Sequence, residues 1–230
     1  MGYYINADDI VRQFREDGFS FKDFNIQVTK RQLWTFATKS GLLSDEFTEK
    51  EFDQSYHIRL NRLFLKDLVR LDQVGQIVAR YLREAMLERK RRFSFETVFS
   101  HPSNIGIMKQ AVESGYKVYL YFVSTESPEI NKFRVAYRVS QNGHDVPPDK
   151  IVSRYFRSLD LLFEATQICH QAYFFDNSKD NMPFTLVAHC KRVGDRMNWD
   201  RIPKRDVAAW FKKYYQEKVL SHPRKGLSNL

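Results

Sequence analysis

The sequence predicts an α/β fold with helices packed on a mostly parallel sheet. Residues 93–98 and 116–123 are rich in aromatic and β-branched side chains and have the length of buried strands. The segment between them, residues 102–114, has the pattern of a helix that ends at Gly115. Because a strand, a helix and a second strand in this order form a parallel pair, we expect a parallel sheet.

The first part of the chain predicts short elements followed by long helices. Tyr3–Ile5 has the character of a strand end, and residues 10–17 predict a short helix that Gly18 terminates. Residues 29–39 and 45–53 predict two more helices. Apolar residues at helical spacing predict a helix through residues 60–71 and a second, long one through residues 74–92.

The second part alternates between helices and strands. Proline at a first turn predicts helices that begin at Pro128 and at Pro147–Pro148, the former running to Gly143 and the latter to about His170. Residues 172–176 and 184–191 predict further strands. Residues 203–220 predict a closing amphipathic helix, and we expect the basic tail, residues 222–230, to be disordered.

Composition indicates one globular domain over residues 1–221. The 230 residues include 43% hydrophobic ones, which suffices for a sizeable core. Only two cysteines occur, without CxxC spacing, so we expect a reducing, cytoplasmic location. No apolar run is long enough to span a bilayer, so we expect no membrane partner.

The formal net charge of +9 fits a nucleic-acid partner or a site for polyanionic nucleotides. The densest basic cluster is Arg89–Arg92, at the end of a predicted helix. Cations there complement the helix dipole and solvate its face. We therefore favour a solvated helix end and expect no nucleic-acid partner.

Five short motifs, in order, resemble the zeta-toxin family of P-loop kinases. They are Ile5-Asn-Ala-Asp-Asp-Ile10, Phe95-Glu-Thr97, Gly115-Tyr-Lys-Val118, Arg134-Val-x-x-Arg138-Val with Gly143-His-Asp-Val-Pro147, and Phe175-Asp-Asn-Ser178. The resemblance covers about residues 3–178, and residues 18–72 would be a helical insertion relative to compact relatives.

The resemblance implies a three-layer P-loop kinase-like fold and an ATP-dependent kinase. Such a kinase uses ATP and Mg²⁺ to phosphorylate a hydroxyl of a small substrate, in this family UDP-amino sugars such as UDP-N-acetylglucosamine, and an antitoxin protein is an expected partner. The sequence contains no GxxxxGK(S/T) motif. That loop supplies the phosphate cradle and the Mg²⁺ ligand. We therefore expect a sheet without its central Walker A strand and no kinase activity from this chain, and we interpret the sequence as a truncated gene product, the result of a misplaced start codon, or an excised piece of a longer protein.

The resemblance assigns the substrate side to acidic residues at two strand ends. Asp8 matches the catalytic base, Asp9 is the weaker candidate, and either residue alone is also explained as a helix cap. Glu96 and Thr97 match the substrate-binding position. A glutamate in the apolar segment 93–98 is costly to bury unless it faces a cleft, which independently favours a site.

The resemblance assigns the phosphate side to a lid of basic residues. Arg134 and Arg138 are four residues apart and share a helix face, so they suit catalytic contacts to phosphate oxygens. His144, Arg154 and Arg157 would complete this lid. An ordinary solvated helix position explains each arginine as well.

Asp176 and Asn177 match the adenine-binding position, although a plain turn explains the same residues. His101, His170, His189 and Cys190 lack metal-ligand spacing, so we expect no metal site among them. The alternative function for the chain is a degenerate kinase fold without catalysis that binds a protein or nucleic acid through its basic surface.

Overall fold

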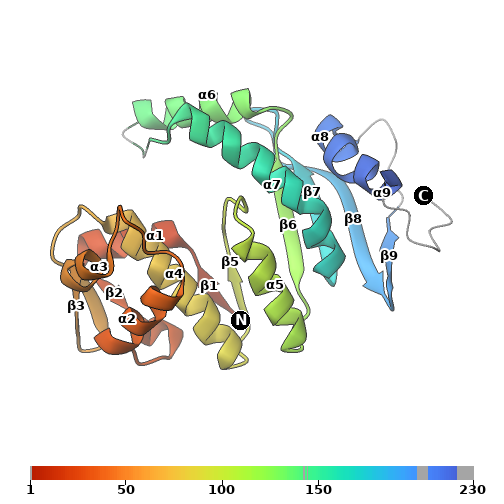
Figure 1. The fold of residues 1–230 in the computed structure, drawn as a ribbon. Helices are drawn as coiled ribbons and strands as arrows, with labels where there is room; N and C mark the ends of the chain where they lie inside the picture. Colours follow the sequence, from red (N-terminus) through yellow and green to blue (C-terminus); the bar gives the residue numbers. More distant parts are fainter. Residues whose placement is uncertain (1, 142, 144, 201–206, 222–230) are drawn as a thin grey trace. The chain divides into compact units, whose positions relative to one another are not determined.

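The chain is a mixed α/β protein with two compact units. The computed structural model describes residues 2–141, 143, 145–200 and 207–221. These residues divide into Met1–Thr97 and Val98–Leu230 (Figure 1). Each unit contains helices and sheets with its own hydrophobic core.

The first unit contains one parallel strand pair. Strand β1 (Tyr3–Ile5) pairs with β5 (Phe93–Phe95), with Tyr3 opposite Phe93. Helix α1 (Ala7–Glu16) follows β1 and packs against α4 (Leu71–Glu88), which precedes β5. Gly75 allows the close approach of these helices, because a Cβ atom there would lie 2.7 Å from Cγ2 of Val11.

The same unit contains an antiparallel sheet that the sequence analysis did not predict. Its strand order is β2 (Phe19–Ser20), β4 (Arg62–Leu65) and β3 (Tyr56–Arg59). The helix expected through residues 60–71 is therefore wrong. Leu60 and Asn61 have φ angles of 53° and 63°, as in a two-residue hairpin turn, and Leu60 is 82% exposed.

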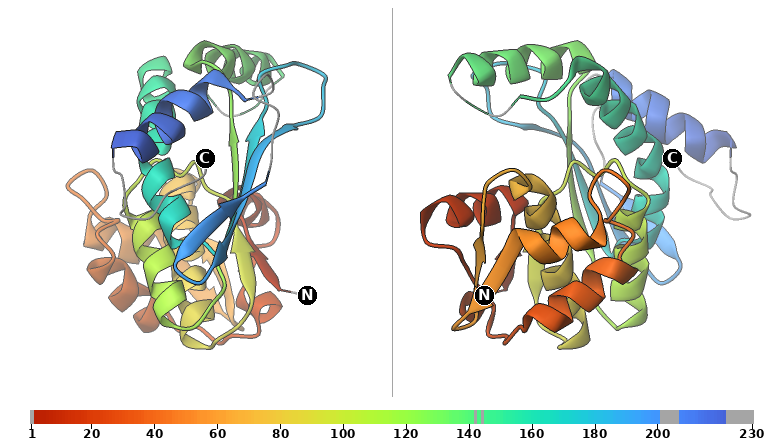
Figure 2. Two further views of the ribbon diagram at one scale, coloured as in Figure 1. Left: turned by 90° about the vertical axis from the view of Figure 1, so that its right-hand side faces the viewer. Right: turned by 60° about the vertical axis from the view of Figure 1, so that its left-hand side comes forward.

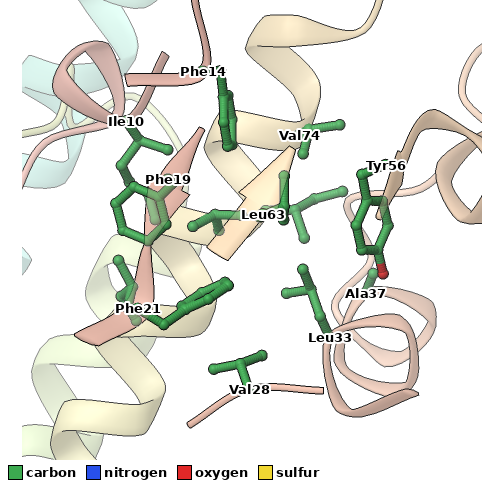
Figure 3. Close-up of a cluster of buried hydrophobic side chains, with 14 of the residues drawn as sticks. Ile10, Phe14, Phe19, Phe21, Val28, Leu33, Ala37, Tyr56, Leu63 and Val74 are labelled. Carbon is green, nitrogen blue, oxygen red and sulfur yellow. The ribbon is translucent and has the colours of Figure 1, made fainter. Parts of the chain in front are cut away.

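Short helices complete this unit. They are the 3₁₀ helix η1 (Phe21–Phe24), α2 (Lys30–Lys39) and α3 (Glu49–Ser55). Thr29 and Thr48 each begin their helix with a capping box, in which the hydroxyl accepts from the backbone three residues on. Apolar side chains from these helices and from the antiparallel sheet fill the core (Figure 3), including Phe19, Phe21, Leu33, Tyr56 and Leu63. The segment 18–72 is thus a mixture of helices and strands.

The second unit is built on a four-stranded sheet in the order β6 (Tyr119–Ser124), β7 (Gln171–Asp176), β8 (Thr185–Val193) and β9 (Arg196–Trp199). Only β6 and β7 are parallel. Across the described strands of both units, two pairings are parallel and four are antiparallel, so the expectation of one mostly parallel sheet is wrong.

Helices α5 (Ser103–Glu113) and α7 (Pro148–Ile168) and a C-terminal helical segment share a core with one face of this sheet. Helix α6 (Pro128–Ser140) contacts α7, and none of its described residues belongs to that core. The C-terminal helical segment comprises α8 (Ala209–Phe211), the π-helical η3 (Lys212–Gln216) and α9 (Glu217–Ser221). Figure 2 shows α7 running along the sheet. Phe122, Phe174 and Cys190 point to the core on this side.

No helix within the described ranges combines the length and the apolar composition that crossing a bilayer requires. The expected tail at residues 222–230, and the start of the expected closing helix at residues 203–206, lie outside the described residues.

Candidate functional site

A polar cluster lies where the parallel strands β1 and β5 end. Carboxyl ends of parallel strands meet at one edge of a sheet, and the loops that follow them commonly form ligand sites. The backbone N–H of Glu96 donates to the carbonyl of Ile5 at 3.3 Å, which extends the pairing one residue beyond β5. Asn6 and Glu96 are therefore neighbours although 90 residues separate them.

Asn6 organises this cluster. It is the N-cap of α1, and its Oδ1 accepts from the backbone N–H of Asp8 at 2.8 Å. Its amide nitrogen Nδ2 donates to Oε2 of Glu96 at 3.2 Å and to the hydroxyl oxygen of Tyr4 at 3.1 Å. The single amide thus caps the helix and holds the Glu96 carboxylate in place.

The two aspartates of the first turn differ in their partners. Asp9 forms an ion pair with Arg12, with 2.7 Å between Oδ1 and Nη2. The carboxylate of Asp8 is exposed and makes no ion pair or side-chain hydrogen bond to another described residue. Asp8 is therefore the aspartate that remains able to accept a proton or a hydrogen bond from a ligand.

The neighbouring carboxylates also affect the pKa of the Tyr4 hydroxyl. The hydrogen bond with Asn6 is the largest single influence and lowers the pKa of Tyr4. The hydrogen bond with Glu96, burial and the charges of Glu96 and Asp9 outweigh it, so that the pKa of Tyr4 is raised overall. Tyr4 is therefore a neutral hydroxyl at neutral pH.

Glu96 lies in a different environment from the one expected. The strand predicted over residues 93–98 ends at Phe95, and both Glu96 and Thr97 are exposed. The cost of burying a carboxylate therefore does not explain Glu96. Its position at the strand end and its bond to Asn6 remain as the reasons to place it in a site.

The arginines predicted for the lid lie on α6 and α7 of the second unit. The guanidinium of Arg134 donates to Oδ1 of Asp180 from Nη2 at 2.9 Å and from Nε at 3.2 Å. Arg138 lies one turn further along α6 and is exposed. The backbone N–H of Gly143 donates to the carbonyl of Arg138 at 2.8 Å, which closes the end of this helix.

Arg154 and Arg157 lie on α7, and the structure gives them different surroundings. Arg154 is half-buried, whereas Arg157 is exposed and donates to the carbonyl and hydroxyl oxygens of Ser153 at 3.2 Å and 3.3 Å. These hydrogen bonds hold the Arg157 guanidinium against its own helix. His144, also predicted for the lid, lies outside the described residues.

Asp176, predicted to bind adenine, anchors the C-terminal helical segment. Its Oδ2 accepts from the indole N–H of Trp210 at 2.9 Å and from the hydroxyl of Ser178 at 2.8 Å, while Oδ1 accepts from the Ser178 N–H at 3.1 Å. The backbone N–H of Asn177 donates to the carbonyl of Ser124 at 2.8 Å. The carboxylate thus already serves the fold of this unit.

The structure adds residues that the sequence analysis did not assign. Asn6 precedes a helix as a typical N-cap, and this signal could have identified it. The partners of Asp176 and Arg134 could not be found from sequence spacing, because Trp210 and Asp180 lie 34 and 46 residues away from them.

The chemistry of the polar cluster follows from its side chains. Two carboxylates, one amide and one phenol can accept from and donate to ligand hydroxyl groups. Within the described ranges, no group of three or more His, Cys, Asp or Glu side chains is arranged to hold a metal ion. Comparisons with protein-family models, curated proteins and solved structures gave no match.

Proposed function

We propose that this chain carries the hydroxyl-substrate site of a zeta-toxin-like small-molecule kinase. The observation that carries the proposal is the Asn6 bridge, which fixes Glu96 beside the start of α1 and leaves Asp8 without a partner among the described residues. The resemblance motifs assign the same two acidic residues to the substrate side. The finer fold assignment, a P-loop kinase-like domain without its Walker A strand, belongs to this proposal.

The proposed roles follow from the remaining hydrogen-bonding capacity. Oε2 of Glu96 accepts from Asn6, so Oε1 is the atom that accepts from a substrate hydroxyl. Asp8, whose carboxylate has no partner among the described residues, accepts a hydrogen bond from a second substrate hydroxyl. Tyr4 adds a neutral hydroxyl beside them. A sugar bearing several hydroxyl groups, such as the amino sugar of UDP-N-acetylglucosamine, suits this set.

The triphosphate of ATP does not fit the residues of the polar cluster, and among the described residues no group of three or more ligating side chains offers a site for Mg²⁺. The charged groups of the cluster, Asp8 and Glu96, are carboxylates that repel phosphate oxygens, and Arg12, on the next turn of α1, is already paired with Asp9. The sequence offers no glycine-rich GxxxxGK(S/T) loop. We therefore assign no phosphoryl-transfer step to this chain and expect it to bind the hydroxyl substrate without transferring phosphate.

Titration calorimetry with UDP-N-acetylglucosamine tests the proposal. We expect saturable binding that Glu96→Gln weakens at least about tenfold, because a hydrogen bond to a charged group contributes about 1.5–3 kcal/mol. Asn6→Asp keeps the helix cap but removes the donor to Glu96, and it should weaken binding similarly.

The matched control is Asp23→Asn, which removes an exposed carboxylate elsewhere in the first unit and should leave the affinity unchanged. Equal binding by the parent chain, Glu96→Gln and Asn6→Asp would refute the assignment of the site. Binding of ATP that requires Mg²⁺ would contradict our conclusion that the chain lacks the nucleotide cradle.

A specific observation also favours the second candidate function, a binding module without catalysis. Phe133 and Tyr137 lie one turn apart on α6, and each is 64% exposed. Exposed aromatic residues of this kind mark protein-binding surfaces. A Phe133→Ser and Tyr137→Ser double variant that keeps sugar-nucleotide binding but loses a protein partner would assign α6 to this second function.

A further inference from the structure

Strand β6 forms one edge of the sheet in the second unit. It pairs with β7 alone among the described strands, and it does so in parallel. An edge strand presents a row of unpaired N–H and C=O groups, which are a template for pairing with a further strand. The outer edge of β6 is therefore a candidate for pairing with another strand.

The backbone groups on that edge can be identified from the hydrogen bonds on the inner one. The carbonyl of Val118 accepts from the N–H of His170 at 2.8 Å, and the carbonyl of Ser124 accepts from that of Asn177 at 2.8 Å. Both carbonyls point toward β7. Because backbone groups alternate along a strand, those of Tyr119, Tyr121 and Val123 point outward. Among the described residues, none outside the strands of this sheet forms a backbone hydrogen bond with Tyr119, Tyr121 or Val123.

The edge also lacks the usual protection against pairing. From Tyr119 to Ser124 the strand contains no charged residue and no proline, and its pairing with β7 has no bulge. The side chains of Tyr119, Tyr121 and Val123 are exposed on the sheet face opposite the helices. This segment has the composition of a strand that pairs.

An aromatic stack leads to this edge from within the sheet. The rings of His189 and Tyr173 stack with 4.2 Å between their centroids. Those of Tyr173 and Tyr121 stack with 4.9 Å between their centroids and an interplanar angle of 4°. Each ring stands on the next strand, so the stack advances one strand at a time. It stops at Tyr121, and an aromatic residue on an added strand would continue it.

We propose that a second copy of this chain pairs on the outer edge, with the two β6 strands antiparallel about a two-fold axis at Tyr121. Tyr121 then lies opposite Tyr121 of the second copy, and Tyr119 lies opposite Val123. These are the residues whose N–H and C=O groups point outward, so every outward group finds a partner. The aromatic stack continues across the axis, and no like charges oppose each other. This inference does not depend on the proposed function.

Sedimentation and light scattering of the full chain over a wide dilution series test the proposal. We expect a reversible dimer with twice the 27.4 kDa mass of one chain. Val123→Pro removes an outward N–H without touching the bonds to β7, so the unit should fold and remain a monomer. Tyr121→Lys places like charges on the axis and should also give a monomer.

The matched control is Tyr137→Lys on α6, because Tyr137 is 64% exposed and Tyr121 is 63% exposed. This control should dimerise like the parent chain, and circular dichroism establishes that each variant is folded. A parent chain that is monomeric throughout the series overturns the proposal, as does a dimer that survives both β6 substitutions.

Cysteine cross-linking tests the register independently of variant stability. The two native cysteines are fully buried. Tyr121→Cys would place two thiols opposite each other with their Cα atoms about 5.5 Å apart, a separation that a disulfide can span. We expect mild oxidation to give a covalent dimer of Tyr121→Cys but not of Tyr137→Cys. Equal cross-linking of both variants refutes the two-fold register.

Discussion

Removing the Asp176 carboxylate should release the C-terminal helical segment from the second unit. The indole N–H of Trp210 donates to Asp176 at 2.9 Å, and Trp210 is buried at the start of that segment. Ser178 donates two further hydrogen bonds to the same carboxylate. Asp176→Ala therefore leaves a buried indole N–H without an acceptor and frees the turn after β7.

The magnitude follows from these contacts. A hydrogen bond to a charged group contributes about 1.5–3 kcal/mol, and an unsatisfied buried donor costs about 1–3 kcal/mol. We expect Asp176→Ala to lower the free energy of unfolding by about 3 kcal/mol. Trp210→Phe keeps an aromatic ring but loses the donor. In the double-mutant cycle, the coupling between the two sites should be about 1.5–3 kcal/mol.

Urea denaturation followed by circular dichroism measures all corners of this cycle. The control is Asp160→Ala, which removes an exposed ion pair to Lys218 with 3.7 Å between Oδ1 and Nζ. Such pairs contribute less than about 1 kcal/mol. Additive effects of Asp176→Ala and Trp210→Phe would refute the anchoring role. An Asp176→Ala variant as stable as the parent chain would refute it as well.

Three further predictions concern stability and ionisation. Leu63→Ala should cost about 2–5 kcal/mol in urea denaturation, whereas Leu60→Ala, at an exposed turn, should change stability by less than about 0.5 kcal/mol; similar costs would contradict the hairpin. Burial raises the pKa of both Cys169 and Cys190 to about 12 from 9.0. Between pH 9.0 and about 12 the folded protein therefore binds more protons than the unfolded chain, so the free energy of unfolding should fall as pH rises through this range. Rapid alkylation of the native protein at pH 8 would contradict the burial of the two thiols. The pKa of Glu51 is lowered to about 2 by the backbone N–H of Thr48, by Arg70 and by the Thr48 hydroxyl; a nuclear magnetic resonance titration midpoint near 4.5 would contradict these bonds.

The long helices were predictable because their apolar spacing reflects burial directly. The helices predicted through residues 74–92 and from Pro147 to about His170 correspond to α4 and α7 within a few residues. The hairpin of β3 and β4 was not predictable in the same way. Leu60, Leu63 and Phe64 fit helical spacing by coincidence, and only the left-handed conformation of Leu60 and Asn61 reveals the turn.

The candidate site was predictable only where local sequence determines it. A strand end followed by a helix start places Asp8, and the second strand end places Glu96, so their neighbourhood follows once β1 and β5 are parallel. The Asn6 bond to Glu96 spans 90 residues and depends on strand register. We expected Glu96 to face a cleft because it lies in an apolar segment predicted to be a buried strand. That reason is wrong, because β5 ends at Phe95 and Glu96 is exposed.

The ion pair of Arg134 bears on its proposed role in binding phosphate. Both nitrogens of its fork contact one oxygen of Asp180, and the Asp180 side chain is 61% exposed. An ion pair with so exposed a partner contributes at most about 1 kcal/mol. A phosphate group carries more charge and accepts from both guanidinium nitrogens on separate oxygens. Asp180 therefore competes only weakly for the Arg134 guanidinium, and an inorganic phosphate ion bound at Arg134 should displace it.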